Sequence, residues 1–263
     1  MKKYIIYILA IFLCGLTLNA REIKKVIGKV NNGYNYWLYT PDGAEEDEIG
    51  KPLVVFLHGK SLSGTDMEKV KKYGTLSALV KGRDIDAYVI APQSPKGAWV
   101  PEKVWNVIDN VLDECNVDTT RIYVLGMSLG GYGTLDVAGS YPDRIAAAIA
   151  MGGGSTLRDM SGLAKVPLWL IHGTGDDLVP VSCSDKVYDA IRTALTDEDE
   201  DRLVYDRITG MNHSKPARLF YHPEIYEWLF QHSLTDPGRP IVEPMELTEE
   251  FFGNCYQGIN WKK

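Results

Sequence analysis

The residues with the clearest chemical potential are Gly126-Met127-Ser128-Leu129-Gly130-Gly131, which contain a Gly-x-Ser-x-Gly pattern. The pattern follows an apolar run ending at Leu125 and precedes a helical segment that stops at Pro142. A tight turn from a strand into a helix needs flanking residues without bulky side chains, and it holds the serine hydroxyl above the sheet. Backbone N–H groups at the helix N-terminus also favour negative charge there. We therefore expect Ser128 to act as a nucleophile.

A serine hydroxyl becomes an effective nucleophile only when a base accepts its proton, and five histidines are candidates. His213 lies in a loop, residues 210–214, just after the last expected strand. The other four end apolar strands or flank an aromatic C-terminal helix, positions that suit packing or surface roles: His58, His172, His222 and His232. His213 is therefore the predicted base.

The base in turn needs a carboxylate that fixes its tautomer and stabilises the imidazolium. Asp176 and Asp177 lie between Ser128 and His213 in the chain, directly after an apolar run of strand length. Either aspartate could instead cap the next helix or lie in a solvated turn. The residues alone leave the choice between the two open.

Acyl transfer also requires two hydrogen-bond donors for the oxyanion. One is the N–H of Leu129, directly after the nucleophile, and the other is expected in the loop His58-Gly59-Lys60-Ser61, with Lys60 N–H as the donor. Trp99 lies in a loop after another strand end and is predicted to line an acyl or sugar pocket. A packing role is the alternative for Trp99.

The elements that must position these residues alternate along the chain. Unbroken apolar runs of strand length predict strands covered on both faces, as in a parallel sheet, at 53–57, 88–91, 122–125, 146–151, 168–171 and 203–208. Residues 35–39 alternate and predict an antiparallel strand. Helices separate the strands, one with an apolar stripe over 104–115 and one with Ser182 as its expected N-cap. The predicted fold class is α/β, with a mostly parallel, doubly wound sheet, helices on both faces, and ligand chemistry at the carboxyl ends of the strands.

Composition limits the classes of function. The 263 residues are 45% hydrophobic and 24% charged, which is typical of a folded protein, and the formal charge of −7 argues against a nucleic-acid partner. The sequence has no Cys-x-x-Cys or His-x-x-His spacing, so we expect no structural metal, and the expected chemistry needs no cofactor. Residues 21–263 are predicted to form a single domain, with an aromatic extension from about residue 237 that packs on it. The sequence does not indicate the oligomeric state.

Residues 1–20 differ from the rest of the chain. Lys2 and Lys3 precede an apolar run from Tyr4 to Leu18, and the segment closes on Ala20. This pattern predicts a secretory signal peptide and a periplasmic or secreted protein, with no stable membrane insertion after cleavage. Cys14 raises a lipoprotein anchor as an alternative, which is less favoured because the bulky Leu13 precedes it.

With these segments in order, the chain resembles the serine esterases of the α/β-hydrolase superfamily. It is similar in particular to the phospholipase/carboxylesterase and feruloyl-esterase-like branch, which extends to predicted peptidases. The resemblance spans roughly residues 35–232, and the segments that carry it are Val54–Gly59, Ala91–Gln93, Gly126–Gly131, His172–Pro180 and Gly210–Ser214.

The resemblance implies a role for each matched residue. Asp176 takes the position of the acid in the pattern His-Gly-x-x-Asp-x-x-Val-Pro, which favours it over Asp177. The oxyanion donors fall on the backbones of Lys60 and Leu129. Lys60 departs from the apolar residues frequent at this position, and its charge could favour an acidic group on the substrate.

The implied activity is hydrolysis of carboxylic esters through an acyl-enzyme on Ser128. The expected partners are small-molecule esters or acyl and feruloyl esters of polysaccharides. A peptidase or an acyltransferase would use the same three residues. A non-catalytic binding protein on a hydrolase scaffold is a further alternative, and the intact order of serine, aspartate and histidine argues against it.

Overall fold

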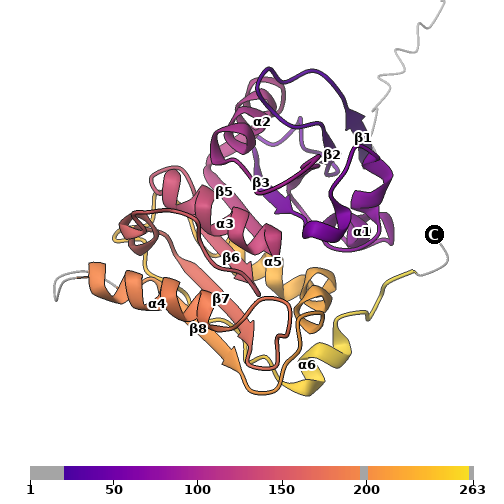
Figure 1. Ribbon diagram of the computed structural model, residues 1–263. Helices are drawn as coiled ribbons and strands as arrows, with labels where there is room; N and C mark the ends of the chain where they lie inside the picture. Colours follow the sequence, from indigo (N-terminus) through magenta and orange to yellow (C-terminus); the bar gives the residue numbers. More distant parts are fainter. Residues whose placement is uncertain (1–20, 196–200, 261–263) are drawn as a thin grey trace, which may run out of the picture.

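The computed structural model describes residues 21–195 and 201–260, so the predicted signal peptide and Cys14 lie outside the described residues. These residues form an eight-stranded sheet with the strand order β1-β2-β4-β3-β5-β6-β7-β8 (Figure 1). All pairings from β4 to β8 along this order are parallel, whereas β2 runs antiparallel to both β1 and β4. The strands are β1 (Glu22–Val26), β2 (Tyr36–Thr40), β3 (Lys51–Leu57), β4 (Tyr88–Pro92), β5 (Val117–Met127), β6 (Ala147–Met151), β7 (Leu168–Gly173) and β8 (Leu203–Ile208).

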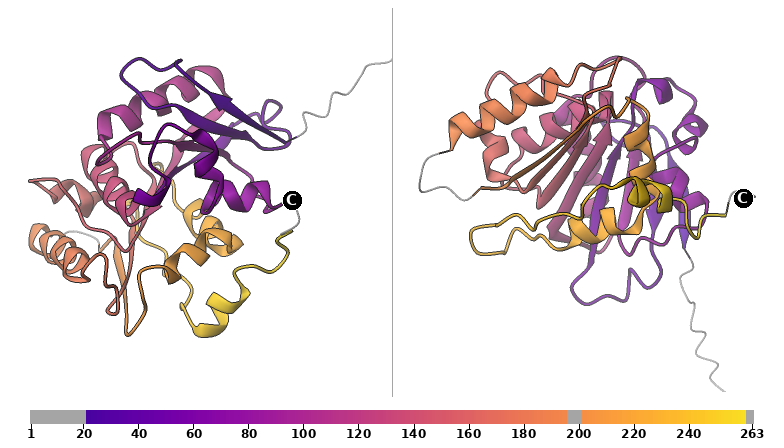
Figure 2. Two further views of the ribbon diagram at one scale, coloured as in Figure 1. Left: turned by 45° about the vertical axis from the view of Figure 1, so that its right-hand side comes forward. Right: turned by 90° about the horizontal axis from the view of Figure 1, so that it is seen from below.

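Helices cover both faces of the sheet (Figure 2). One face packs against α2 (Pro101–Glu114), α3 (Leu129–Ser140) and α4 (Ser182–Ala194). The other packs against α1 (Thr75–Val80), α5 (Pro223–Phe230) and α6 (Glu249–Asn254). Short 3₁₀ helices complete the described structure: η1 (Lys60–Leu62), η2 (Met67–Lys71), η3 (Ser161–Lys165) and η4 (Lys215–Tyr221). The chain therefore has the α/β-hydrolase fold that the sequence predicted.

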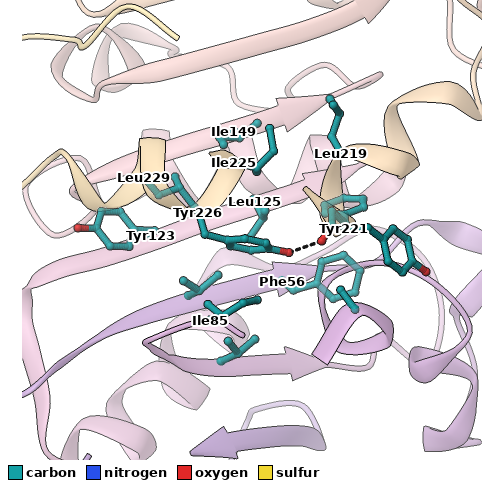
Figure 3. Packing of buried hydrophobic residues seen from close by; sticks show 14 of the residues in the cluster. Phe56, Ile85, Tyr123, Leu125, Ile149, Leu219, Tyr221, Ile225, Tyr226 and Leu229 are labelled. Carbon is teal, nitrogen blue, oxygen red and sulfur yellow. Dashed lines mark hydrogen bonds between the residues drawn. The ribbon is translucent and has the colours of Figure 1, made fainter. Parts of the chain in front are cut away.

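The two faces of the sheet carry separate apolar clusters. Successive strand residues point to opposite faces, so Val54 and Phe56 of β3 join the cluster beneath α1 and α5, while Val55 joins the cluster beneath α2 and α3. Figure 3 shows Phe56 among side chains from η4 and α5, where Tyr226 donates a hydrogen bond to the carbonyl oxygen of Phe220 at 2.6 Å. This packing anchors the segment that follows the His213 loop.

The apolar runs, the alternating strand and the striped helix all form as predicted. β1 was not predicted because Lys24 and Lys25 interrupt its apolar pattern, which a strand at the sheet edge tolerates. The prediction that Ser182 caps a helix is wrong. Ser182 is the first residue of α4, the N-cap is Val181, and no side chain caps this helix end.

The segment after residue 237 packs against the apolar cluster on the α1 and α5 side of the sheet. Phe252 and Cys255 are buried, and Trp228 Nε1 donates to the carbonyl oxygen of Val242 at 2.8 Å. Arg239 donates to the carbonyl oxygen of Pro142 at 2.8 Å, which ties the extension to the turn after α3. Trp261, also part of the predicted aromatic extension, lies outside the described residues. The three cysteines of the described chain, Cys115, Cys183 and Cys255, are free thiols.

Candidate active site

Ser128 stands on the turn between β5 and α3, at the carboxyl edge of the sheet. Its φ of 60° and ψ of −123° are unusual for a residue with a side chain, and the glycines around it explain how the turn closes. A Cβ on Gly130 would lie 1.8 Å from the carbonyl oxygen of Leu57, and one on Gly126 would lie 2.5 Å from the carbonyl oxygen of Gly130. Only glycine fits at either position, so the sequence pattern is a packing requirement of this turn.

His213 and Asp176 meet across the ends of two neighbouring strands. Asp176 lies in the loop after β7 and His213 in the loop after β8, and His213 Nδ1 is 2.6 Å from Asp176 Oδ2. A carboxylate only accepts hydrogen bonds, so the Nδ1 atom carries the proton and Nε2 of the neutral ring is left as an acceptor. The orientation suits a base that takes a proton at Nε2.

The carboxylate of Asp176 is buried to 1% exposure and held on both oxygens. Burial alone would raise the pKa of Asp176, but hydrogen bonds from Val179 N–H, His213 and Leu178 N–H lower it overall. The two backbone donors bind Oδ1 at 2.8 and 3.0 Å, which leaves Oδ2 for the histidine. Asp177, the competing candidate, is exposed.

A second histidine touches the same carboxylate oxygen, and the sequence did not suggest it. His172 Nε2 lies 3.2 Å from Asp176 Oδ2 and 3.0 Å from the carbonyl oxygen of Val179. Its Nδ1 lies 2.8 Å from Ser184 Oγ. Both acceptors face Nε2, so this atom carries a proton and donates toward Asp176. The available signal was that His172 lies near the end of β7, four residues before Asp176, with a turn between them.

The loop after β3 presents the second predicted oxyanion donor. Lys60 begins η1 and Leu129 begins α3, so neither N–H has an acceptor within its own helix. Both backbone polar groups of the preceding Gly59 have a partner. Its N–H donates to Tyr73 Oη at 3.2 Å, and its carbonyl oxygen lies 2.8 Å from His58 Nδ1. The loop that carries the Lys60 N–H is therefore held by the ring of His58 within the loop and by Tyr73 outside it.

These residues surround one cavity of about 710 Å³. Ser128 and His213 face it with both predicted oxyanion residues, Lys60 and Leu129. The remaining lining is largely apolar or aromatic and comprises Gly59, Ser61, Tyr73, Met127, Tyr132, Leu178, Val179, Ser214 and Ala217. An apolar cavity beside a serine and two backbone donors can hold an acyl group with its carbonyl carbon at the hydroxyl.

Trp99 does not line this cavity. It is 3% exposed, and its ring packs against Tyr34 and His58 behind the loop after β3. Its Nε1 donates to the carbonyl oxygen of His58 at 3.2 Å, and a Cβ on Gly133 of α3 would lie 2.5 Å from the indole. The sequence placed Trp99 at the correct edge of the sheet, but its side chain turns inward and supports the loop.

Residues 100–223 match the phospholipase/carboxylesterase family, and this range contains Ser128, Asp176 and His213. The bifunctional acetylxylan esterase/xylanase of Neocallimastix patriciarum is 26% identical over 156 residues, which are 56% of this chain and 22% of that protein. A crystal structure of a thermostable esterase is 25% identical with a TM-score of 0.62, and covers 82% of this chain and 64% of that one. The chain has the α/β-hydrolase fold and is similar to esterases of that fold.

A more distant structure has the same fold as this chain. A feruloyl esterase module from Clostridium thermocellum, complexed with sinapinate, has a TM-score of 0.54 at 13% identity and covers 74% of this chain and 82% of that one. The putative esterase NocK of Nocardia uniformis subsp. tsuyamanensis is 26% identical over 194 residues, which are 69% of this chain and 53% of that protein. The chain therefore matches 22% and 53% of the length of these two curated relatives. Within residues 21–195 and 201–260, no helix has the length and hydropathy to cross a membrane. The same residues contain no group of three or more potential metal-ligating side chains.

Proposed function

We propose that this hydrolase cleaves carboxylic esters in two acyl-transfer steps. Ser128 Oγ attacks the ester carbonyl while His213 Nε2 takes its proton, and Asp176 stabilises the imidazolium that forms. The N–H groups of Lys60 and Leu129 donate to the oxyanion. His213 then protonates the leaving alcohol, and water repeats the sequence on the acyl-enzyme. The observation that carries the proposal is the 2.6 Å contact between His213 and the buried Asp176, at the cavity that Ser128 also lines.

The proposed substrates are acyl esters of small molecules or of polysaccharides. The apolar lining of the cavity supports an acyl group as the bound part of the substrate, and acetylxylan esterase and feruloyl esterase are among the matched proteins. A hydrolysis panel of acetyl, longer acyl, feruloyl and peptide substrates tests the class. Hydrolysis of peptides alone would favour the peptidase alternative, and transfer to an added alcohol in preference to water would favour the acyltransferase.

Labelling by a fluorophosphonate tests whether Ser128 is the nucleophile. Wild type should be labelled and Ser128→Ala should not. Ser140→Ala is the matched control, because Ser140 is exposed at the far end of the same helix and should leave labelling intact. A folded wild type that remains unlabelled and hydrolyses no ester would support the binding protein instead.

The proposal also places the enzyme outside the cytoplasm, in the periplasm or the medium. Its support is the sequence of residues 1–20, with two lysines, an apolar run and a terminal alanine. Expression of the full chain in a bacterial host, followed by fractionation and mass spectrometry of the N-terminus, tests this. An uncleaved chain in the cytoplasm would contradict export, and a lipid-modified Cys14 would favour the anchored alternative.

A further inference from the structure

Lys60 gives the catalytic cavity a positive rim in a chain whose formal charge is −7. Among the described residues that line the cavity, Lys60 is the one with a permanent charge. Its side chain is exposed, and no carboxylate of residues 21–195 and 201–260 lies within 4.0 Å of its amino group. The oxyanion role requires only the backbone of this residue, so its ammonium group is available to a substrate.

A second groove, of about 500 Å³, adjoins the catalytic cavity and shares Ser214 and Ala217 with it. Its other lining residues are Asn212, Lys215, Arg218, Glu249 and Tyr256. Lys215 forms an ion pair with Glu249. Arg218 is exposed, its guanidinium lies 5.8 Å from the centre of the Tyr256 ring, and no carboxylate in the described part of the chain lies within 4.0 Å of it. The groove therefore carries a guanidinium without a carboxylate partner.

The groove lies where the alcohol part of a bound ester would be expected. In the proposed reaction His213 delivers a proton to the leaving alcohol, which must therefore lie against the His213 ring. Asn212 and Ser214 flank His213 in the chain and form walls of the groove. A substituent on the alcohol would extend from His213 into this groove, while the acyl group occupies the apolar cavity.

We propose that the preferred substrates carry a carboxylate on their alcohol part, as acyl esters of uronic acids do. This inference rests on the esterase activity proposed above. Arg218 binds the carboxylate, since a guanidinium offers paired N–H donors that match a carboxylate. Lys60, on the other side of the reacting centre, adds to the positive potential that draws an anionic ester into the site.

Two esters that differ in one charge test the inference. The substrates 4-acetoxybenzoate and 4-acetoxybenzamide share the acetyl group and have alcohol parts of similar shape, and the released phenols absorb in the ultraviolet. Wild type should show a ratio of kcat/KM, carboxylate over amide, about two- to fivefold above that of Arg218→Met, as expected for an exposed ion pair. Lys60→Met should lower the same ratio, Arg218→Lys should preserve part of it, and added salt should reduce it in wild type.

Lys165→Met is the matched control for net charge. Lys165 is exposed at the end of η3 and lines neither the cavity nor the groove, so its loss should leave the ratio as in wild type. Hydrolysis of both esters with equal ratios in wild type, Arg218→Met and Lys60→Met would overturn the inference while the esterase proposal stands. A folded wild type that hydrolyses neither ester and is not labelled at Ser128 would overturn both.

Discussion

His58 predicts how the stability of this protein depends on pH. Its ring is fully buried, its Nδ1 lies 2.8 Å from the carbonyl oxygen of Gly59, and its Nε2 accepts the N–H of Ser94 at 3.1 Å. An N–H can only donate, so Nε2 carries no proton and the ring is neutral. Burial lowers the pKa of His58 to about 4. Protonation of the ring would place a hydrogen on Nε2, where it would point at the Ser94 N–H and have no acceptor.

The size of the effect follows from the two pKa values. In the unfolded chain the ring takes a proton near its ordinary pKa of about 6.5, so the unfolded state binds the proton first as the pH falls. The stabilising contribution is complete above pH 6.5 and is lost as the pH falls toward 4. With about 1.36 kcal/mol per pKa unit, His58 alone lowers the free energy of unfolding by about 2 kcal/mol from pH 7 to pH 5, and by about 3 kcal/mol at pH 4.

Urea unfolding of wild type and His58→Gln at pH 7 and pH 5 measures this contribution. Burial also lowers the pKa of His222 and of His232, but both residues are present in both proteins and cancel in the comparison. His58→Gln should already be less stable than wild type at pH 7, and this constant difference cancels when the change in the free energy of unfolding between the two pH values is compared. Wild type should lose about 2 kcal/mol more than His58→Gln between the two pH values. Equal losses, or a His58 ring that titrates near pH 6.5 by proton NMR in the folded protein, would refute the reasoning.

Three further substitutions, with a fourth as a control, test the site and its supports. Asp176→Asn should lower kcat for an aryl acetate by about 10⁴-fold, because an amide N–H facing His213 Nδ1 favours the tautomer with a protonated Nε2; a loss below tenfold would contradict the assigned role. Gly130→Ala should lower the free energy of unfolding in urea by more than about 2 kcal/mol, because its Cβ would lie 1.8 Å from a carbonyl oxygen. Gly253→Ala in α6, with open space around it, should instead change stability by less than about 1 kcal/mol. Asp136→Ala should cost about 1–3 kcal/mol in the same assay, since its buried carboxylate accepts from Ser155 Oγ and from Thr156 N–H and Oγ1.

The central parallel strands of this fold were predictable because they are apolar on both faces, whereas β8, at the sheet edge, is only partly buried. Runs such as Leu53–Leu57 are buried throughout, and that pattern needs no knowledge of the partner strands. β1 lacked the signal because an edge strand is stabilised by its one neighbour and not by burial. The 3₁₀ helices and α6 are shorter than two turns of apolar periodicity, and tertiary packing decides whether they form.

The sequence predicted some features of the candidate site better than others. Ser128 sits in a turn whose glycine requirement is local, so the motif was visible in the sequence. The pairing of His213 with Asp176 joins two loops 37 residues apart, and the sequence supplied only the order of the residues. The place of Trp99 behind the loop, and the contact of His172 with Asp176, depend on which way a side chain turns at a strand end. Sequence pattern carries no information on that direction.

In the loop after β3, the proposed oxyanion role of the Lys60 N–H and the proposed substrate-attracting role of its ammonium group can be tested separately. His58, Tyr73 and Trp99 hold this loop through hydrogen bonds to Gly59 and His58, and none of these bonds involves the Lys60 side chain. His58→Gln should therefore lower kcat for 4-acetoxybenzoate and 4-acetoxybenzamide together, since both reactions use the same oxyanion donor. Lys60→Met should instead change the ratio between the two esters, because only one carries a charge for the ammonium group to attract. A common loss in both variants would place the Lys60 side chain in support of the loop and not in substrate selection.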